Sequence, residues 1–334
     1  MQSIIKLKNP PSFFSHAAVG GYEERRGPLG ENFDFCDSDD RFGMKTFESA
    51  EGEMGRVSLN LALKKGALSH ERLSLIVAGD LQNQCVASSG GLYTFGTPYI
   101  GLYGACSTCT ESLMTLAVMM SECEKYEFGA AVTSSHNSAA ERQFRLPLEY
   151  GGQRPPTAQW TATAAGAFVL TRGQGRVIIS EAMPGKIVDG AIKDASNMGG
   201  AMARAAADSI ISYFSLSGLS PSDFDCIVTG DLGAVGSSIL SELLCEAGLS
   251  AAAERHLDCG LLLYDRNKQD VHSGGSGCGC SASVLSTYFL PRLGSGRMRN
   301  ILFLSTGALM SPQSVQQGAN ILGIAPAIRI ISQF

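Results

Sequence analysis

The sequence has few charged residues, no basic cluster and no long hydrophobic run. Charged residues make up 17% of the 334 positions, and Lys and Arg are scattered along a chain with a formal net charge of −5. The chain therefore lacks the basic patch that nucleic-acid binding needs, and this class of function is excluded. No apolar run approaches the roughly 20 residues that span a bilayer, and residues 1–10 lack the apolar core of a secretory signal. We therefore expect a soluble cytoplasmic chain that is still able to dock on a membrane protein.

The sequence also lacks a regular cysteine framework. Its ten cysteines are too sparse and irregular for a disulfide scaffold, so reduced thiols are expected. Cys106 and Cys109 form a C-x-x-C pair, and Cys278 and Cys280 form a C-x-C pair, a combination that suggests zinc. Each pair sits among Gly and Ser in a turn, and no regular second ligand pair supports it. We predict no metal site.

An internal repeat is the most informative feature of the sequence. The segments 68–69, 76–77 and 79–81 (Leu-Ser, Ile-Val and Gly-Asp-Leu) recur with the same spacing at 219–220, 227–228 and 230–232. Each copy follows a helix-like segment and closes an apolar strand-like run. This order indicates duplication, and the length of the chain agrees with two halves, each with its own core. We place them at 1–173 and 174–334, with the join near residues 173–175.

Periodicity predicts four helices and four strands in equivalent places. The helices are expected at 54–65, 104–120, 198–214 and 277–289, and the strands at 73–78, 128–134, 224–229 and 300–305. Alternating helices and short apolar strands favour an α/β fold with mostly parallel sheets covered on both faces. Two segments interrupt this alternation, 20–43 and 141–160. We expect them to be loops that cover a site.

Small-residue turns from strand into helix predict a site at the centre of the molecule. Cys106 follows Gly104 and Ala105 in one such turn, and Cys278 lies in the equivalent turn of the second half. A thiol at a helix N-terminus has a lowered pKa and lies beside unpaired N–H groups that bind anions. The alternative is that Cys106 is a small buried apolar residue.

Two histidines are candidates for the same crevice. His136 follows Ser135 at the end of a predicted strand, and His272 precedes the Gly-rich turn 273–277. Either one is able to contact a ligand, although a lone histidine is more often structural. We expect the other three, His16, His70 and His256, on the surface or in loops.

The segment 141–160 carries arginines that are suited to carboxylates. Arg142 and Arg154 offer planar guanidinium forks, and surface pairing with Glu141 or Glu149 is the alternative. Asp194 precedes a helix with Asn197 and is a further ligand candidate, although helix capping also explains it. Asp80 and Asp231 end equivalent strands.

Longer motifs identify a family. The Gly104 to Ser107 turn at the start of a buried helix, in a duplicated α/β chain, resembles the thiolase and ketoacyl synthase superfamily. Further runs, which together extend the similarity over nearly the whole chain, resemble the stage V sporulation protein AD family: Thr133 to His136, Ala140 to Gln143, Pro147 to Trp160 and His272 to Cys280. The long Pro-containing run is specific, whereas the Gly-Ala-Cys motif alone is weak.

The resemblance implies a thiolase-like, five-layered αβαβα sandwich and a ligand. Members of this family are implied to bind dipicolinic acid (pyridine-2,6-dicarboxylate), alone or with calcium, and to act in its uptake into the developing spore. Their implied partners are membrane-embedded proteins of the same operon, which places the chain in the cytoplasm or peripherally on the spore inner membrane. The fold also implies a homodimer. No cofactor other than ligand-borne calcium is expected.

The resemblance leaves three functions open. In condensing enzymes of this fold the strand matching 226–229 ends in a catalytic His, but here it ends in Gly230-Asp231-Leu232-Gly233. This difference favours a non-catalytic binding protein whose ligand contacts include Cys106, Ser135, His136, Arg142, Arg154, Asp194, His272 and Cys278. The second reading is an acyltransferase with Cys106 as nucleophile and His136 or His272 as base. The third is a scaffold with a vestigial crevice.

Overall fold

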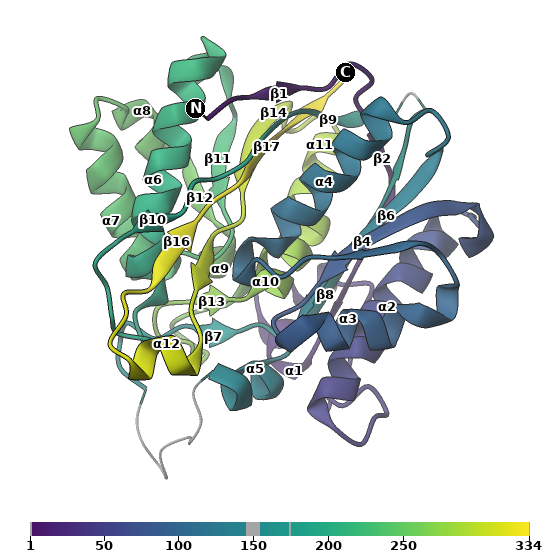
Figure 1. Ribbon diagram of the computed structural model, residues 1–334, viewed down its shortest axis with the longest axis horizontal. Helices are drawn as coiled ribbons and strands as arrows, with labels where there is room; N and C mark the ends of the chain where they lie inside the picture. The colour runs from purple at the N-terminus through teal and green to yellow at the C-terminus, as the bar shows by residue number, and fades with distance from the viewer. Residues whose placement is uncertain (1, 145–153, 174, 334) are drawn as a thin grey trace.

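A computed structural model describes residues 2–144, 154–173 and 175–333. Most of its strands form one long sheet of two half-sheets, which Figure 1 shows with helices between them and on both outer faces, and the others form two small sheets, β10-β16-β15 and β13-β7. The half-sheets meet where β2 pairs with β9 through Ser12 and Ile178. This is the layered α/β architecture that the sequence predicts.

Five strands with two orientations form the main path of the first half-sheet. β4 pairs in parallel with β5 and β6, whereas β6, β8 and β2 pair antiparallel. In spatial order the strands are β5 (Tyr99–Gly101), β4 (Leu73–Gly79), β6 (Phe128–Ser135), β8 (Ala164–Thr171) and β2 (Ser12–Gly20). The expected mostly parallel sheet is therefore wrong, because only the strands joined by crossover helices run parallel.

The second half-sheet repeats this arrangement. β11 is parallel to β12 and β14, and β17 is antiparallel to β14 and β9. In spatial order the strands are β12 (His256–Asp258), β11 (Cys226–Thr229), β14 (Asn300–Leu304), β17 (Ala327–Ser332) and β9 (Val177–Met183). Numbered along each half, both orders are third, second, fourth, fifth, first. The repeat in the sequence therefore reflects a repeat of topology.

Three helical layers enclose the half-sheets. The outer layer over the first contains α2 (Phe47–Lys65) and α3 (Val86–Leu92), and that over the second contains α6 (Met198–Ser217) and α7 (Gly233–Glu246). The central layer contains α4 (Thr108–Glu122) and α10 (Cys278–Val284), which continues through a π-helical turn at Leu285–Phe289. Fully buried side chains such as Leu113, Leu116 and Met120 make this layer the main core, each contributing about 1.5–3 kcal/mol by burial.

Short elements fill the connections. They are β1 (Ile5–Lys6), α1 (Tyr22–Arg26), β3 (Phe35–Cys36), α5 (Asn137–Phe144), β7 (Trp160–Thr161), β10 (Val188–Asp189), α8 (Ser250–Glu254), α9 (Cys259–Leu263), β13 (Gly275–Ser276), α11 (Leu290–Gly294), β15 (Gly307–Leu309), α12 (Pro312–Gln316) and β16 (Leu322–Ile324). Two predicted loops are thus partly regular: segment 20–43 contains α1 and β3, and residues 141–144 belong to α5. The part of the second segment at 145–153 lies outside the described residues.

Some predicted boundaries and positions need correction. The first predicted helix, α2, begins at Phe47 rather than Met54, because the Thr46 side chain caps it by accepting from the Ser49 N–H at 3.2 Å. His16 and His256 lie on strands, not on the surface or in loops. His16 Nδ1 is 2.8 Å from Ser286 Oγ, and His256 Nε2 is 2.7 Å from Thr229 Oγ1.

Within the described residues, no helix is both long enough and apolar enough to cross a bilayer. The division into domains at residues 173 and 174 stays a prediction.

Candidate functional site

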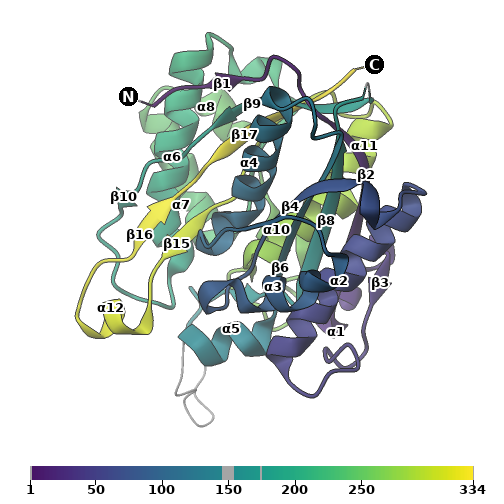
Figure 2. The ribbon, with the colours of Figure 1, turned by 45° about the vertical axis from the view of Figure 1, so that its right-hand side comes forward.

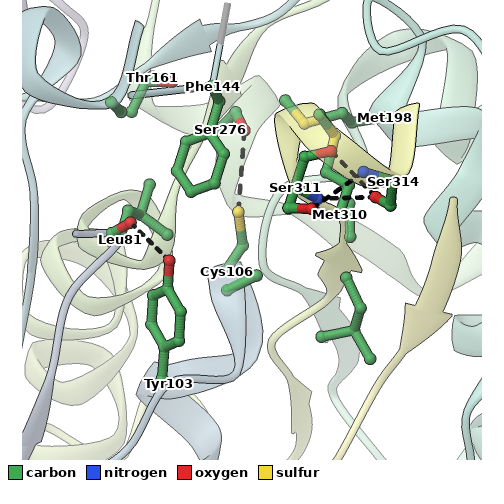
Figure 3. A pocket seen from close by; sticks show the side chains of 14 residues that line it. Leu81, Tyr103, Cys106, Phe144, Thr161, Met198, Ser276, Met310, Ser311 and Ser314 are labelled. Atoms are coloured by element: carbon green, nitrogen blue, oxygen red, sulfur yellow. Dashed lines mark hydrogen bonds between the residues drawn. The ribbon is translucent and has the colours of Figure 1, made fainter. Parts of the chain in front are cut away.

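A cavity of about 350 Å³ lies where the two halves meet, and we call it the inner cavity. Figure 3 shows its wall, which is mostly apolar with several hydroxyl groups. No Lys, Arg or His side chain of the described residues lines it. The lining residues are Leu81, Tyr103, Ala105, Cys106, Ala140, Phe144, Thr161, Met198, Ser276, Ala308, Leu309, Met310, Ser311 and Ser314. Its volume suits a small ligand.

A strained turn presents Cys106 to the inner cavity. Ala105 has a φ of +55°, a left-handed conformation that non-glycine residues seldom adopt. The turn of Ala105–Ser107 leads directly into α4, and Cys106 is buried, with 5% of its surface exposed. Its Sγ is 4.0 Å from Ser276 Oγ, across the boundary between the halves.

The turn before α10 supplies the opposite wall. Gly277 has a φ of +97°, and a Cβ there would lie 2.7 Å from Ser135 Oγ, so only glycine fits without strain. The Gly277 N–H donates to Asp231 Oδ2 at 2.9 Å. This turn therefore fixes Ser276 beside Cys106 and joins it to the end of β11.

Asp231 is the acceptor at the centre of this arrangement. Its fully buried carboxylate also accepts from Ser276 Oγ at 3.3 Å and from Thr306 Oγ1 at 2.7 Å. Burial raises its pKa to about 6, against the opposing effect of its hydrogen bonds with Cys106, Thr306, Gly277 and Ser276.

The expectation of a lowered pKa for Cys106 is wrong. Burial raises the pKa of this thiol well above its usual value, and the negative charge of Asp231 raises it further. The helical dipole does not compensate, because α4 begins only at Thr108 and no cation lines the inner cavity among the described residues. At neutral pH Cys106 is a thiol that is able to donate a hydrogen bond, not a thiolate.

Neither candidate histidine lines the inner cavity. His136 is fully buried beside Phe47, with 5.1 Å between ring centroids, and its Nε2 is 2.8 Å from the carbonyl oxygen of Asp40. Burial lowers its pKa, so the ring is neutral and Nε2 carries the proton donated to that carbonyl. His272 is instead half-buried, with Nε2 3.0 Å from Asp270 Oδ1.

Ser135 and Cys278 connect the halves beneath the cavity. Ser135 Oγ donates to the carbonyl of Ala162 at 2.6 Å and accepts from the Gly279 N–H at 3.2 Å. Cys278 Sγ donates to the carbonyl of Ser134 at 3.0 Å and packs with Leu81, Cys106 and Ala140. Both side chains are fully buried, so they support the wall from behind.

The remaining candidates lie away from the inner cavity. Arg142 contacts Glu48, and the guanidinium of Arg154 lies 3.0 Å from Asp270 Oδ2. Asp194 is exposed and accepts from the Ser196 N–H at 2.8 Å, while Asn197 caps α6 through the Gly200 N–H. Whether any of these residues contacts a ligand stays a prediction.

Sequence reasoning missed much of the wall. Asp231 stood out as the end of a repeated strand, and its equivalence to Asp80 was the available signal for a role. Ser276 and the residues around α12 are far from Cys106 in the sequence, and their approach depends on the long-range pairing of β13 with β7 and of β15 with β16. Tyr103 lies only three residues before Cys106, but its local sequence did not indicate that it lines a cavity.

Comparison with solved structures shows the fold. The cerulenin-bound OleA of Xanthomonas campestris is 12% identical, with a TM-score of 0.62, over 98% of this chain and 100% of that one. The 3-oxoacyl-(acyl-carrier-protein) synthase III of Aquifex aeolicus VF5 is 11% identical, with a TM-score of 0.57, over 95% and 99% of the chains. The predicted thiolase-like fold is confirmed.

Comparison with protein families and with individual protein sequences identifies the family as well as the fold. The family model for stage V sporulation protein AD (SpoVAD) matches residues 1–331. The stage V sporulation protein AD of Bacillus subtilis (strain 168) is 39% identical over 322 residues, which cover 96% of this chain and 94% of that protein. The predicted resemblance is confirmed, and the chain belongs to the stage V sporulation protein AD family of sporulation proteins.

Proposed function

We propose that this chain binds dipicolinic acid in the inner cavity, without catalysis, and takes part in its uptake into the developing spore. The observation that carries the proposal is a cavity of about 350 Å³ at the junction of the halves, apolar on its faces and edged by hydroxyl groups. Such a space suits a planar ring with polar substituents. Family membership supports the link to sporulation.

Named side chains match the parts of such a ligand. The rings of Tyr103 and Phe144 offer flat apolar contact, and Ser276, Ser311 and Ser314 offer hydroxyl donors. Since Asp231 is an anion above about pH 6, it disfavours a free carboxylate close by unless a proton or a cation intervenes. A calcium chelate of dipicolinate would meet this requirement, so calcium belongs in the test.

Calorimetric titration with dipicolinate, with and without calcium, tests the proposal. Wild-type protein should bind saturably, and Cys106→Ala should weaken binding by about threefold to tenfold through loss of a neutral hydrogen-bond donor. Cys245→Ala is the matched control, because Cys245 is exposed on α7 and should bind like wild type. Absence of saturable heat in every condition would refute dipicolinate binding.

The alternative is a thiolase-like acyltransferase with Cys106 as nucleophile. Its support is that Cys106 lines the cavity of a fold shared with condensing enzymes such as the synthase III structure. The raised pKa of Cys106 and the positions of His136 and His272 disfavour it. Incubation with acyl-CoA followed by intact mass measurement decides, because only an acyltransferase gains one acyl group that Cys106→Ala lacks.

A homodimer is also proposed, by way of the edge of the first half-sheet. Around the edge strand β5, Val86, Tyr93, Tyr99 and Tyr103 are between 37% and 77% exposed, more apolar surface than an unpartnered edge usually carries. Sedimentation of wild type and Tyr93→Glu tests this: a dimer that the charge dissociates supports the proposal, and a wild-type monomer refutes it. The proposed membrane-embedded partners and peripheral location rest on family resemblance.

A further inference from the structure

A second cavity, outside the site described above, has the wall of an anion site. It encloses about 410 Å³, and we call it the outer pocket. Its wall includes the guanidinium groups of Arg142 and Arg154, the rings of Phe47 and Trp160, and the amide of Asn137. The inner cavity, by contrast, has no cationic side chain among its described lining residues.

Helix α5 separates the two spaces. Ser138 and Arg142, four residues apart, line the outer pocket, whereas Ala140 and Phe144, also four residues apart, line the inner cavity. Side chains at i and i+4 share one face of a helix, so these pairs occupy different faces. The outer pocket is therefore a separate space rather than an extension of the inner one.

Strand β7 makes the same division. Trp160 lines the outer pocket and Thr161, its neighbour, lines the inner cavity. Successive side chains of a strand point to opposite faces, so β7 places an aromatic ring on one side and a hydroxyl on the other. Together α5 and β7 form a wall with a binding surface on each side.

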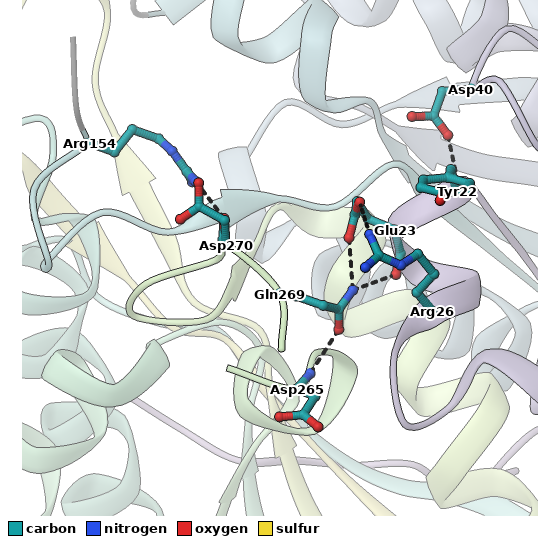
Figure 4. Close-up of polar contacts among 8 residues, drawn as sticks. All are labelled: Tyr22, Glu23, Arg26, Asp40, Arg154, Asp265, Gln269 and Asp270. Atoms are coloured by element: carbon teal, nitrogen blue, oxygen red, sulfur yellow. Dashed lines mark hydrogen bonds and ion pairs between the residues drawn. The ribbon is translucent and has the colours of Figure 1, made fainter. Parts of the chain in front are cut away.

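Both guanidinium groups keep donors for a ligand. Arg142 contacts Glu48 through one nitrogen. Arg154 contacts both the side chain and the backbone carbonyl of Asp270 through Nη2, and Figure 4 shows the pair of Arg154 and Asp270. Nη1 of Arg154 makes no hydrogen bond but is buried, so it reaches a ligand only after the side chain shifts. A guanidinium has five N–H donors, so each arginine has N–H groups left over beside its ion pair. These ion pairs are also weak, because exposed pairs contribute only about 0–1 kcal/mol to stability.

Aromatic rings complete the surface. The guanidinium of Arg154 lies 5.0 Å from the centroid of the Trp160 ring, and that of Arg41 lies 4.5 Å from the Phe47 ring. Flat rings next to planar forks favour a planar ligand with carboxylate groups at its edge. Glu141 is also in the wall, and Glu48 and Asp270 already pair with the two arginines, so a ligand carboxylate must compete with these acidic side chains.

We propose that the outer pocket is a second binding site for a small planar aromatic carboxylate. Arg142 and Arg154 bind its carboxylate, and Phe47 and Trp160 contact its ring. The proposal is independent of dipicolinate binding in the inner cavity, because α5 and β7 lie between the two sites.

The chain contains a single tryptophan, Trp160, which makes its fluorescence specific for the outer pocket. The probe is dipicolinate, titrated while tryptophan emission is followed, with N-acetyltryptophanamide in parallel to correct for absorption by the probe. Wild type should show a saturable change. Arg154→Gln should weaken it by about tenfold or more, and the half-exposed Arg142→Gln by about threefold.

Two controls separate this site from the inner cavity. Arg72 is a matched exposed arginine that directly precedes β4 and pairs with Glu127. Arg72→Gln should leave the titration unchanged. Ala308→Phe, which fills the inner cavity, should also leave the Trp160 response intact. The proposal is overturned by an unchanged Trp160 emission, or by a response that Arg142→Gln and Arg154→Gln leave as in wild type. If Arg154→Gln alone fails to fold by circular dichroism, the exposed Arg142→Gln still decides.

Discussion

Asp80 and Asp231 follow equivalent strands of the two halves, but their carboxylates have different partners. Asp80 accepts from the Gln82 N–H at 2.8 Å and from the Ser88 N–H and Oγ at 2.7 and 2.6 Å, all within the eight residues that follow it. Asp231 accepts from Ser276, Gly277 and Thr306, which lie 45 to 75 residues away. One carboxylate holds a local turn, and the other joins distant segments around a cavity.

The comparison shows how the duplicated halves have diverged. Asp80 faces the buried carboxyl of Glu51, while Asp231 faces Cys106 and raises the pKa of its thiol. The same residue type at the same place in the topology is therefore structural in one half and part of the candidate site in the other. Three substitutions, which give four predictions, test this division.

Asp80→Ala should cause the largest loss of stability. It removes the acceptor of three hydrogen bonds in a fully buried turn and leaves two backbone N–H groups unsatisfied. We expect the free energy of unfolding in urea to fall by about 3–5 kcal/mol. Alkylation of Cys106 should not change in the folded protein. A loss below about 1 kcal/mol would show that the turn does not depend on this carboxylate.

Asp231 should make stability depend on pH. Its pKa rises from 3.8 to about 6 on folding, so the folded state holds the proton more tightly. The resulting stabilisation is complete below about pH 4 and is lost as the pH rises through about 6. Relative to Asp231→Asn, wild type should therefore lose about 2–3 kcal/mol of unfolding free energy across that window. Parallel curves for the two proteins would contradict the raised pKa.

Asp231→Asn should also make Cys106 more reactive. Removing the negative charge lowers the pKa of the thiol and so increases the fraction of thiolate at a given pH. The rate of iodoacetamide labelling at Cys106, followed by peptide mass spectrometry, should therefore rise several-fold relative to wild type. Labelling of the exposed Cys245 serves as the internal control. An unchanged rate at Cys106 would mean that burial alone suppresses the thiolate.

Glu51→Gln should have the smallest effect. Burial and the charge of Asp80 raise the pKa of Glu51 well above its usual value, so at neutral pH the carboxyl is neutral and resembles an amide. Its acceptor contact with Gln82 Nε2, at 2.7 Å, is available to glutamine as well. We expect a change of less than about 0.5 kcal/mol in unfolding free energy. A large loss would show that Glu51 is ionised.

The sequence predicts the fold better than the site. The repeat of Gly79-Asp80-Leu81 at 230–232 and the helix and strand periodicity are local signals, so the duplicated layers are predictable. The ionisation of Cys106 is not, because it depends on a carboxylate more than 100 residues away. Carboxylate binding by Arg142 and Arg154 stays a prediction, and both residues line the outer pocket instead of the inner cavity.

The most direct test of dipicolinate binding in the inner cavity is calorimetric titration of wild type and Ala308→Phe. Ala308 lines that cavity with a nearly buried methyl group, and a phenyl ring there would occupy the proposed ligand space. With matching thermal unfolding as the folding control, Ala308→Phe should lose one dipicolinate site relative to wild type. Equal stoichiometry and affinity in the two proteins would contradict the proposed location.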